Sequence, residues 1–252
     1  YFANSSNSFG NESYLVNNAI YNMGVSGTGT FYGMYLVSTV SYIKVLNNTI
    51  QKNTDGSNGI HRGFYLSSTP NNAEFTNNLV TITGSGTGTK YCYYSNSSST
   101  WTGGNNLFHM DATAGTNYVS RFSANHTTIA AWSTATSSTG NSDANPSILA
   151  GSYTPLNISA DNLGTPLVTV PVDIDGVTRS LTTPDVGAVE FVGLPGDVSI
   201  QDAWLEEVDA CFGTADSAYV TIKHDFGGAA IDFSIDTMTV NWSTTGPVSD
   251  AG

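Results

Sequence analysis

Four pairs of adjacent asparagines recur along the first half of this 252-residue chain at nearly constant spacing. The pairs are Asn17-Asn18, Asn47-Asn48, Asn77-Asn78 and Asn105-Asn106, and they are separated by 30, 30 and 28 residues. A fixed period of this length is the signature of a solenoid, in which each repeat forms one coil and buries its apolar face only against neighbouring coils. The spacing is too regular for an ordinary sandwich or barrel, and it predicts an all-β, right-handed parallel β-helix.

Aligned columns around the pairs show where the strands lie. Two positions before each pair stand Leu15, Val45, Phe75 and Gly103, and three positions after its first member stand Ile20, Ile50, Val80 and Phe108. The position immediately before the first column varies among Tyr14, Lys44, Glu74 and Thr102. This alternation is typical of strands with one face buried and one face in water.

A second aligned segment lies twelve residues before each of the last three pairs. It comprises Gly33–Leu36, Gly63–Leu66 and Tyr91–Tyr94, and Gly-rich connections precede it. Each coil is therefore expected to hold at least two strands, and coils should stack at the ~4.8 Å strand spacing.

The asparagines themselves suit the turns of such a stack. Asn tolerates the left-handed backbone conformation, and its amide can donate to one coil while it accepts from the next. We expect all eight residues to form a structural ladder. The alternative, that these side chains bind a ligand, explains identical residues at a fixed period less well.

After Phe108 the period ends, and the chain continues through Ile129-Ala130-Ala131-Trp132, Asp173-Ile174-Asp175-Gly176 and Asp185-Val186-Gly187-Ala188-Val189-Glu190. This order resembles the closing segment of bacterial secreted parallel β-helix proteins, which often end in a motif close to Asp-Ile-Gly-Ala-Tyr-Glu. With the repeats, the resemblance covers residues 1–192. It implies that residues 109–192 cap the last coil, whose open strand edges would otherwise invite association.

Asp173 and Asp175 suggest an alternative role for part of this cap. With nearby backbone carbonyls they could chelate calcium, although one Asp-x-Asp-Gly is much less specific than a full calcium loop. We otherwise expect no metal and no cofactor.

From residue 193 to residue 252 the sequence pattern changes, and it predicts strands at Val198–Leu205, Ala218–Phe226 and Ile231–Trp242. This segment looks like the start of an immunoglobulin-like β-sandwich, and it is short for a complete one. The stretch Ser234–Trp242 resembles modules of large surface proteins of gliding Bacteroidota, including adhesins exported by the type IX secretion system. That resemblance implies periplasmic O-glycosylation motifs at Asp216-Ser217-Ala218 and Asp236-Thr237-Met238, with Ser217 and Thr237 as sugar acceptors.

Composition excludes some partners. The formal net charge of −13, from 20 acidic and seven basic residues, opposes binding to nucleic acid or anionic lipid headgroups. No run of 18 apolar residues is present, so we expect no direct membrane insertion. The chain lacks an initiator Met and a signal peptide, which suggests a processed protein or an internal fragment.

Cys92 and Cys211 fall in different predicted domains, which disfavours a mutual disulfide. Cys92 would then be a small buried hydrophobe.

Catalytic candidates are sparse. In the coil region the acidic residues are Glu12, Asp55, Glu74 and Asp111, whereas a β-helix hydrolase needs at least two carboxylates close together. The best constellation is His61-Arg62 near Asp55, and a basic pair at the start of a strand is ordinarily a surface feature. His109, His126 and His224 lack metal-ligand spacing.

Binding is better supported, because Tyr35, Tyr65 and Tyr93 fall in register and could form an external aromatic ladder. Stacked tyrosines can hold sugar rings, or they can simply stabilise adjacent coils. We therefore expect a noncatalytic fragment of a large bacterial cell-surface adhesin. It would be extracellular and would attach to surface glycans or abiotic surfaces during gliding, and other parts of its chain would engage outer-membrane secretion and anchoring proteins. The alternatives are a secreted polysaccharide lyase or glycoside hydrolase and a passive structural stalk.

Overall fold

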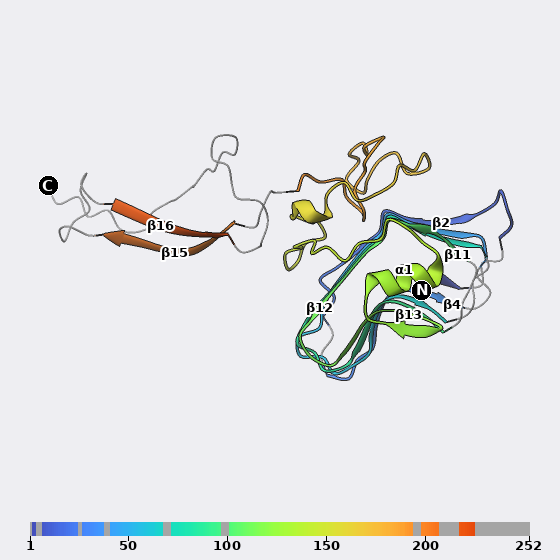
Figure 1. Cartoon of the computed structure of the whole chain (residues 1–252), viewed down its shortest axis with the longest axis horizontal. Helices are drawn as coiled ribbons and strands as arrows, with labels where there is room; N and C mark the ends of the chain where they lie inside the picture. Colours follow the sequence, from blue (N-terminus) through green and yellow to red (C-terminus); the bar gives the residue numbers. More distant parts are fainter. Residues whose placement is uncertain are drawn as a thin grey trace. The chain divides into compact units, whose positions relative to one another are not determined.

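A computed structural model describes residues 2–3, 7–24, 27–37, 41–67, 72–96, 101–193, 198–206 and 217–224. The chain divides into two compact units, residues 1–194 and 195–252. The first unit is a parallel β-solenoid of about three turns. Its successive coils overlie one another in Figure 1.

Three parallel sheets build the solenoid, and each complete coil gives one strand to each sheet. The first sheet contains β1 (Phe2–Ala3), β4 (Phe31–Val37), β7 (His61–Leu66), β10 (Thr89–Ser95), β13 (Thr116–Phe122) and the antiparallel β14 (Ala124–His126). The second contains β2 (Ser13–Val16), β5 (Ile43–Leu46), β8 (Ala73–Thr76) and β11 (Trp101–Gly104). The third contains β3 (Ala19–Ile20), β6 (Thr49–Asn53), β9 (Leu79–Gly84) and β12 (Leu107–Ala112).

The core lies between the three sheets, and its columns follow the repeat. Leu15 pairs with Val45, Val45 with Phe75 and Phe75 with Gly103. In the third sheet Ile50, Val80 and Phe108 are completely buried. Because every coil repeats the same inward positions, like side chains stack on like, and each buried aliphatic or aromatic side chain contributes about 1.5–3 kcal/mol of transfer free energy.

The second asparagine of each pair points inward and forms a hydrogen-bonded ladder through the coils. The amides of Asn18, Asn48 and Asn78 donate to Oδ1 of Asn48, Asn78 and Asn106 over 2.8, 2.9 and 3.0 Å. Asn106 in turn donates to Oδ1 of Asn141 over 3.3 Å. Asn141 is thus a further rung, although it lies outside the repeat and no second Asn accompanies it.

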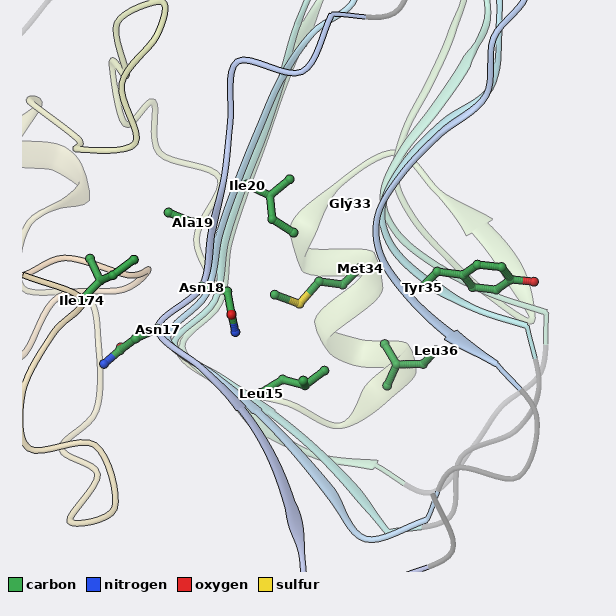
Figure 2. A pocket seen from close by; sticks show the side chains of 10 residues that line it. All are labelled: Leu15, Asn17, Asn18, Ala19, Ile20, Gly33, Met34, Tyr35, Leu36 and Ile174. Atoms are coloured by element: carbon green, nitrogen blue, oxygen red, sulfur yellow. The ribbon is translucent and has the colours of Figure 1, made fainter. Parts of the chain in front are cut away.

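The first asparagine of each pair adopts the left-handed conformation, with φ between 52° and 57°, and points outward. Figure 2 shows this division at the first coil, where Asn18 enters the interior and Asn17 points toward the segment that carries Ile174. These outward amides donate to backbone carbonyls of the segment after the repeats, with Asn105 bonded to Leu163 O, Asn77 to Thr165 O, Asn47 to Asp185 O and Asn17 to Val172 O. One dipeptide therefore both ties coils together and anchors a distant segment.

The sequence assigns residues 109–192 as a whole to a cap over the last coil, and the structure divides that segment into two parts. The helix α1 (Ile129–Thr136) lies against the last coil, where Trp132 is completely buried and its ring centroid is 4.7 Å from that of Phe108. Thr128 caps the helix by accepting from Ala131 N at 3.2 Å. Residues 162–190 follow the short 3-10 helix η1 (Ile158–Ala160). They run along the corner of the solenoid formed by the four outward asparagines, which we call the asparagine corner, because the amides of these asparagines donate hydrogen bonds to the segment.

The segment Asp185–Glu190 sits directly against this corner. Gly187 has φ +87°, and a Cβ built on it would lie 2.6 Å from Oγ1 of Thr49, so no larger residue fits without rearrangement. The next residue, Ala188, donates its N–H to the same Thr49 oxygen at 2.8 Å. Arg179 fastens the segment by donating to Gly187 O at 2.8 Å and to Asn17 Oδ1 at 3.0 Å, and it forms an ion pair with Glu190.

In the second unit, β15 (Val198–Glu206) and β16 (Ser217–His224) form an antiparallel pair. A two-stranded pair does not define an immunoglobulin-like sandwich. The expected strand at 231–242, Thr237 and Cys211 lie outside the described residues, as does the side chain of Ser217 at the start of β16.

Candidate functional site

The outer face of the first sheet carries two parallel columns of large side chains that cross the coils. In the first column the strand register aligns Tyr32, Arg62, Tyr91 and Tyr118. In the second it aligns Tyr35, Tyr65, Tyr94 and Arg121. We call these eight residues the tyrosine-arginine face. Figure 2 shows Tyr35 pointing away from the solenoid interior, whereas its neighbours Met34 and Leu36 point into it.

In the second column, the three tyrosine rings contact one another from coil to coil. The rings of Tyr35 and Tyr65 stack with centroids 4.5 Å apart and planes 14° apart, and Tyr65 meets Tyr94 edge to face at 5.4 Å. Burial raises the pKa of the Tyr65 hydroxyl, and the adjacent Tyr35 raises it further. This hydroxyl therefore stays protonated at neutral pH and keeps its capacity to donate a hydrogen bond.

Tyr93, the third expected member of this ladder, does not lie on the face. It is completely buried, pairs with Phe64 in the register and packs against Phe75 with centroids 5.5 Å apart. The alignment by distance from the asparagine pair fails at this coil because the connection is one residue shorter. Tyr94, eleven rather than twelve residues before its pair, takes the outward position instead.

Arg62 lies among three tyrosine rings from three strands. Its guanidinium carbon is 3.9 Å from the centroid of Tyr94, 4.4 Å from that of Tyr65 and 5.3 Å from that of Tyr32. It also donates to the Tyr32 hydroxyl at 3.1 Å. Arginine over aromatic faces gains about 0.5–2 kcal/mol per contact, so this group joins neighbouring coils.

Arg121 reaches the same aromatic ring from another strand, with its guanidinium carbon 5.8 Å from the Tyr94 centroid. It donates to the amide oxygens of Asn96 and Asn125 at 3.3 and 3.1 Å. Among the described residues the ion pairs are Lys44–Glu74 and Arg179–Glu190. Both arginines of the tyrosine-arginine face therefore lack a carboxylate partner within the described chain.

Asp55, His61 and Arg62 do not converge on one site. His61 and Arg62 are adjacent in β7, so they point to opposite faces of the sheet, and His61 is completely buried. Its Nε2 lies 2.8 Å from Ser57 Oγ, and burial, aided by the nearby Lys52 and Lys90, lowers the pKa of His61 to about 4. Asp55 accepts from Ser85 N and Oγ at 2.7 and 2.8 Å, which occupies one carboxylate oxygen in a turn.

Lys90 is a buried cation that sequence reasoning did not single out. It is completely buried, and its Nζ donates to carbonyl oxygens of Gly86, Gly88 and Ala114 and to Asn117 Oδ1. Burial lowers the pKa of this ammonium group. The surrounding oxygens belong to the coil connections, so Lys90 organises these connections; no signal in the repeat distinguishes it from a surface lysine.

The calcium candidates are occupied by the chain itself. Asp173 is buried, and its two oxygens accept the N–H groups of Asp175, Val177 and Glu190 at 2.8–2.9 Å. Asp175 accepts from the Tyr153 hydroxyl at 3.0 Å. Within the described residues, no group of three or more His, Cys, Asp or Glu side chains could hold a metal ion.

Of two open hollows on the solenoid, the first borders the tyrosine-arginine face at Tyr35 and the second lies away from it. The first, of about 430 Å³, is at the end of the first coil and is lined by Leu15, Ile20, Met34 and Leu36 with no charged side chain (Figure 2). The second, of about 590 Å³, lies beside Gln51 and Asn53 and contains Asp55 as its one carboxylate. Neither hollow brings two carboxylates together.

Two remaining predictions concern Cys92 and membrane insertion. Cys92 is buried in the core, and burial raises the pKa of its thiol. No helix within the described ranges is long and apolar enough to cross a membrane.

Comparisons of the chain with protein-family models, with curated proteins and with solved structures found no match.

Proposed function

We propose that this chain is a noncatalytic segment of a bacterial cell-surface adhesin, and that the tyrosine-arginine face attaches to surface glycans. The observation that carries the proposal is the second column, in which Tyr35, Tyr65 and Tyr94 present an unbroken row of rings across three coils. Tyrosine combines an apolar ring with a polar hydroxyl, which suits the apolar faces and hydroxyl edges of sugars. Neighbouring coils repeat at ~4.8 Å, so the row suits an extended chain of sugars.

The distribution of carboxylates supports a noncatalytic role. Glycoside hydrolysis ordinarily uses two carboxylates about 5–10 Å apart across the sugar bond. The tyrosine-arginine face contains no acidic residue. Glu74 is paired with Lys44 on the second sheet, and Asp55 is held by Ser85 at a coil connection. A secreted polysaccharide lyase or glycoside hydrolase is the alternative function, and a passive stalk is the second alternative.

The wider setting of the proposal comes from resemblance. The match of Asp185–Glu190 to a closing motif, and of Ser234–Trp242 to modules of gliding Bacteroidota, supports a right-handed helix followed by an immunoglobulin-like module. The same resemblance supports type IX secretion, an extracellular location, a role in gliding and anchoring partners at the outer membrane. Ser217 and Thr237 are the proposed sugar acceptors of the second unit.

A glycan-array assay with product release followed in parallel tests this function. The variant carrying Tyr35→Ala, Tyr65→Ala and Tyr94→Ala should lose retention on the glycans that the unmodified protein binds. Its matched control is Tyr21→Ala with Tyr153→Ala, because this tyrosine pair, with centroids 5.0 Å apart, lies outside the first sheet. Unaltered retention by a folded triple variant, or release of products from any polysaccharide, would contradict the proposal.

A further inference from the structure

We infer that the ligand of the tyrosine-arginine face is an anionic glycan, with its sugar rings on the tyrosines and its acidic groups at Arg62 and Arg121. This inference rests on the proposed function and specifies its ligand. The inference is argued from the positive charges of Arg62 and Arg121, whereas the proposed function is argued from the aromatic row.

The two arginines stand out when all seven basic residues are placed. Lys52, Lys90 and Arg179 are buried, and Lys44 is paired with Glu74 on the second sheet. Lys223 belongs to the second unit. The two remaining cations, Arg62 and Arg121, lie on one face and against one ring, that of Tyr94.

Their protein partners are neutral. Arg62 donates to a tyrosine hydroxyl, and Arg121 donates to two amide oxygens. Two like charges beside one ring repel each other, and neither is neutralised by a carboxylate. In a chain with a formal net charge of −13, 20 acidic residues are available, and none occupies either column. The face is therefore a local positive region on an acidic protein, and it is complementary to an anion.

The side-chain type also fits. A guanidinium group presents a planar fork that binds carboxylate or sulfate-like oxygens through paired, charge-assisted hydrogen bonds. Because the guanidinium carbons of Arg62 and Arg121 lie 3.9 and 5.8 Å from the Tyr94 centroid, a sugar that contacts this ring lies within reach of both charges. The aromatic rings and the acidic groups of one ligand chain would thus be bound together.

Pairs of polysaccharides that share a backbone but differ in whether it carries charged acidic groups provide the test. The probes are polygalacturonate with its highly methyl-esterified form, and dextran sulfate with dextran, titrated into the folded protein at low and high salt. We expect at least one anionic probe to bind about tenfold or more tighter than its neutral partner, and to weaken as salt rises. The carboxylate and sulfate arms identify which acidic group is preferred.

The variants Arg62→Gln and Arg121→Gln should each weaken binding of the anionic probe about tenfold, as expected for loss of one charge-assisted contact. Lys44→Gln is the matched control, because it removes the same charge from the second sheet. Arg121→Gln keeps the test valid if Arg62→Gln proves unstable in a thermal melt. Equal binding of charged and neutral partners, with binding still lost in the triple tyrosine variant, would overturn this inference and leave the proposed function intact. Absence of binding to every probe and to the glycan array would overturn both.

Discussion

The guanidinium carbon of Arg62 lies 3.9 Å from the centroid of the Tyr94 ring, so a cation of β7 packs directly on an aromatic ring of β10. This contact joins two coils that also share backbone hydrogen bonds. It places the positive charge within the aromatic row rather than at the margin of the row. The charge and the rings together therefore define the proposed binding face.

A double-mutant cycle measures this contact. Arg62→Gln and Tyr94→Leu should each reduce the free energy of unfolding, and the pair should show a coupling of about 0.5–2 kcal/mol in denaturant titrations. Independent effects that simply add would show that the two groups do not interact in solution.

The inward ladder should be indispensable for stability. Asn78→Leu removes the side chain that donates to Asn106 Oδ1, Val45 O and Thr76 O, and that accepts from Asn48. Each buried polar group left without a partner costs about 1–3 kcal/mol, so we expect a loss of more than about 3 kcal/mol by chemical denaturation. The control Asn11→Leu changes an exposed residue and should leave the unfolding midpoint nearly unchanged. Similar midpoints for both variants would refute the role of the ladder.

The close approach at Gly187 should hold the segment 162–190 on the corner. Gly187→Ala places a Cβ 2.6 Å from Thr49 Oγ1 and 3.1 Å from Leu79 Cβ, and we expect faster hydrogen exchange and faster proteolysis within 162–190. Gly176→Ala provides a matched control, since Gly176 also has a positive φ of +83° but its Cβ would meet nothing within 4 Å. The expectation fails if both variants exchange and cleave alike.

Burial of His61 makes stability depend on pH. Its folded pKa is lowered to about 4 from an ordinary 6.5, so folding favours the neutral ring. The contribution of the neutral His61 ring to the free energy of unfolding is complete above about pH 6.5. It is lost as pH falls toward about 4, because the unfolded chain takes up the proton first. Relative to a His61→Gln variant, the unmodified protein should therefore lose stability between these values. A constant difference in unfolding free energy across this range would contradict the burial of a neutral His61.

The stack of coils could be predicted from sequence because one local rule repeats. The Asn pairs and the flanking apolar positions fix inward columns such as Val45, Phe75 and Ile50, and period-2 alternation assigns their neighbours to the outer side. The same rule misplaces Tyr93, because a connection one residue shorter shifts the strand while leaving the pair in place.

The remaining features depend on contacts between distant parts of the chain. Nothing local to Asn141 shows that it extends the ladder, since its neighbours lack the repeat pattern. The path of residues 162–190 follows from hydrogen bonds to outward asparagines up to 155 residues away, which no local pattern encodes. The first column of the face is hidden for a different reason: Tyr32 and Arg62 occupy equivalent positions of the repeat, 30 residues apart, but no shared residue type marks them as one column.

The measurement that tests the binding face most directly is hydroxyl-radical footprinting of the unmodified protein with and without a polysaccharide that it retains. Bound glycan should protect Tyr32, Tyr35, Tyr65 and Tyr94 from oxidation, whereas Tyr21 and Tyr153 should react equally in both samples. Protection of Tyr21 and Tyr153, or unchanged oxidation of the face during saturating binding, would contradict the assignment of the tyrosine-arginine face as the glycan-binding surface.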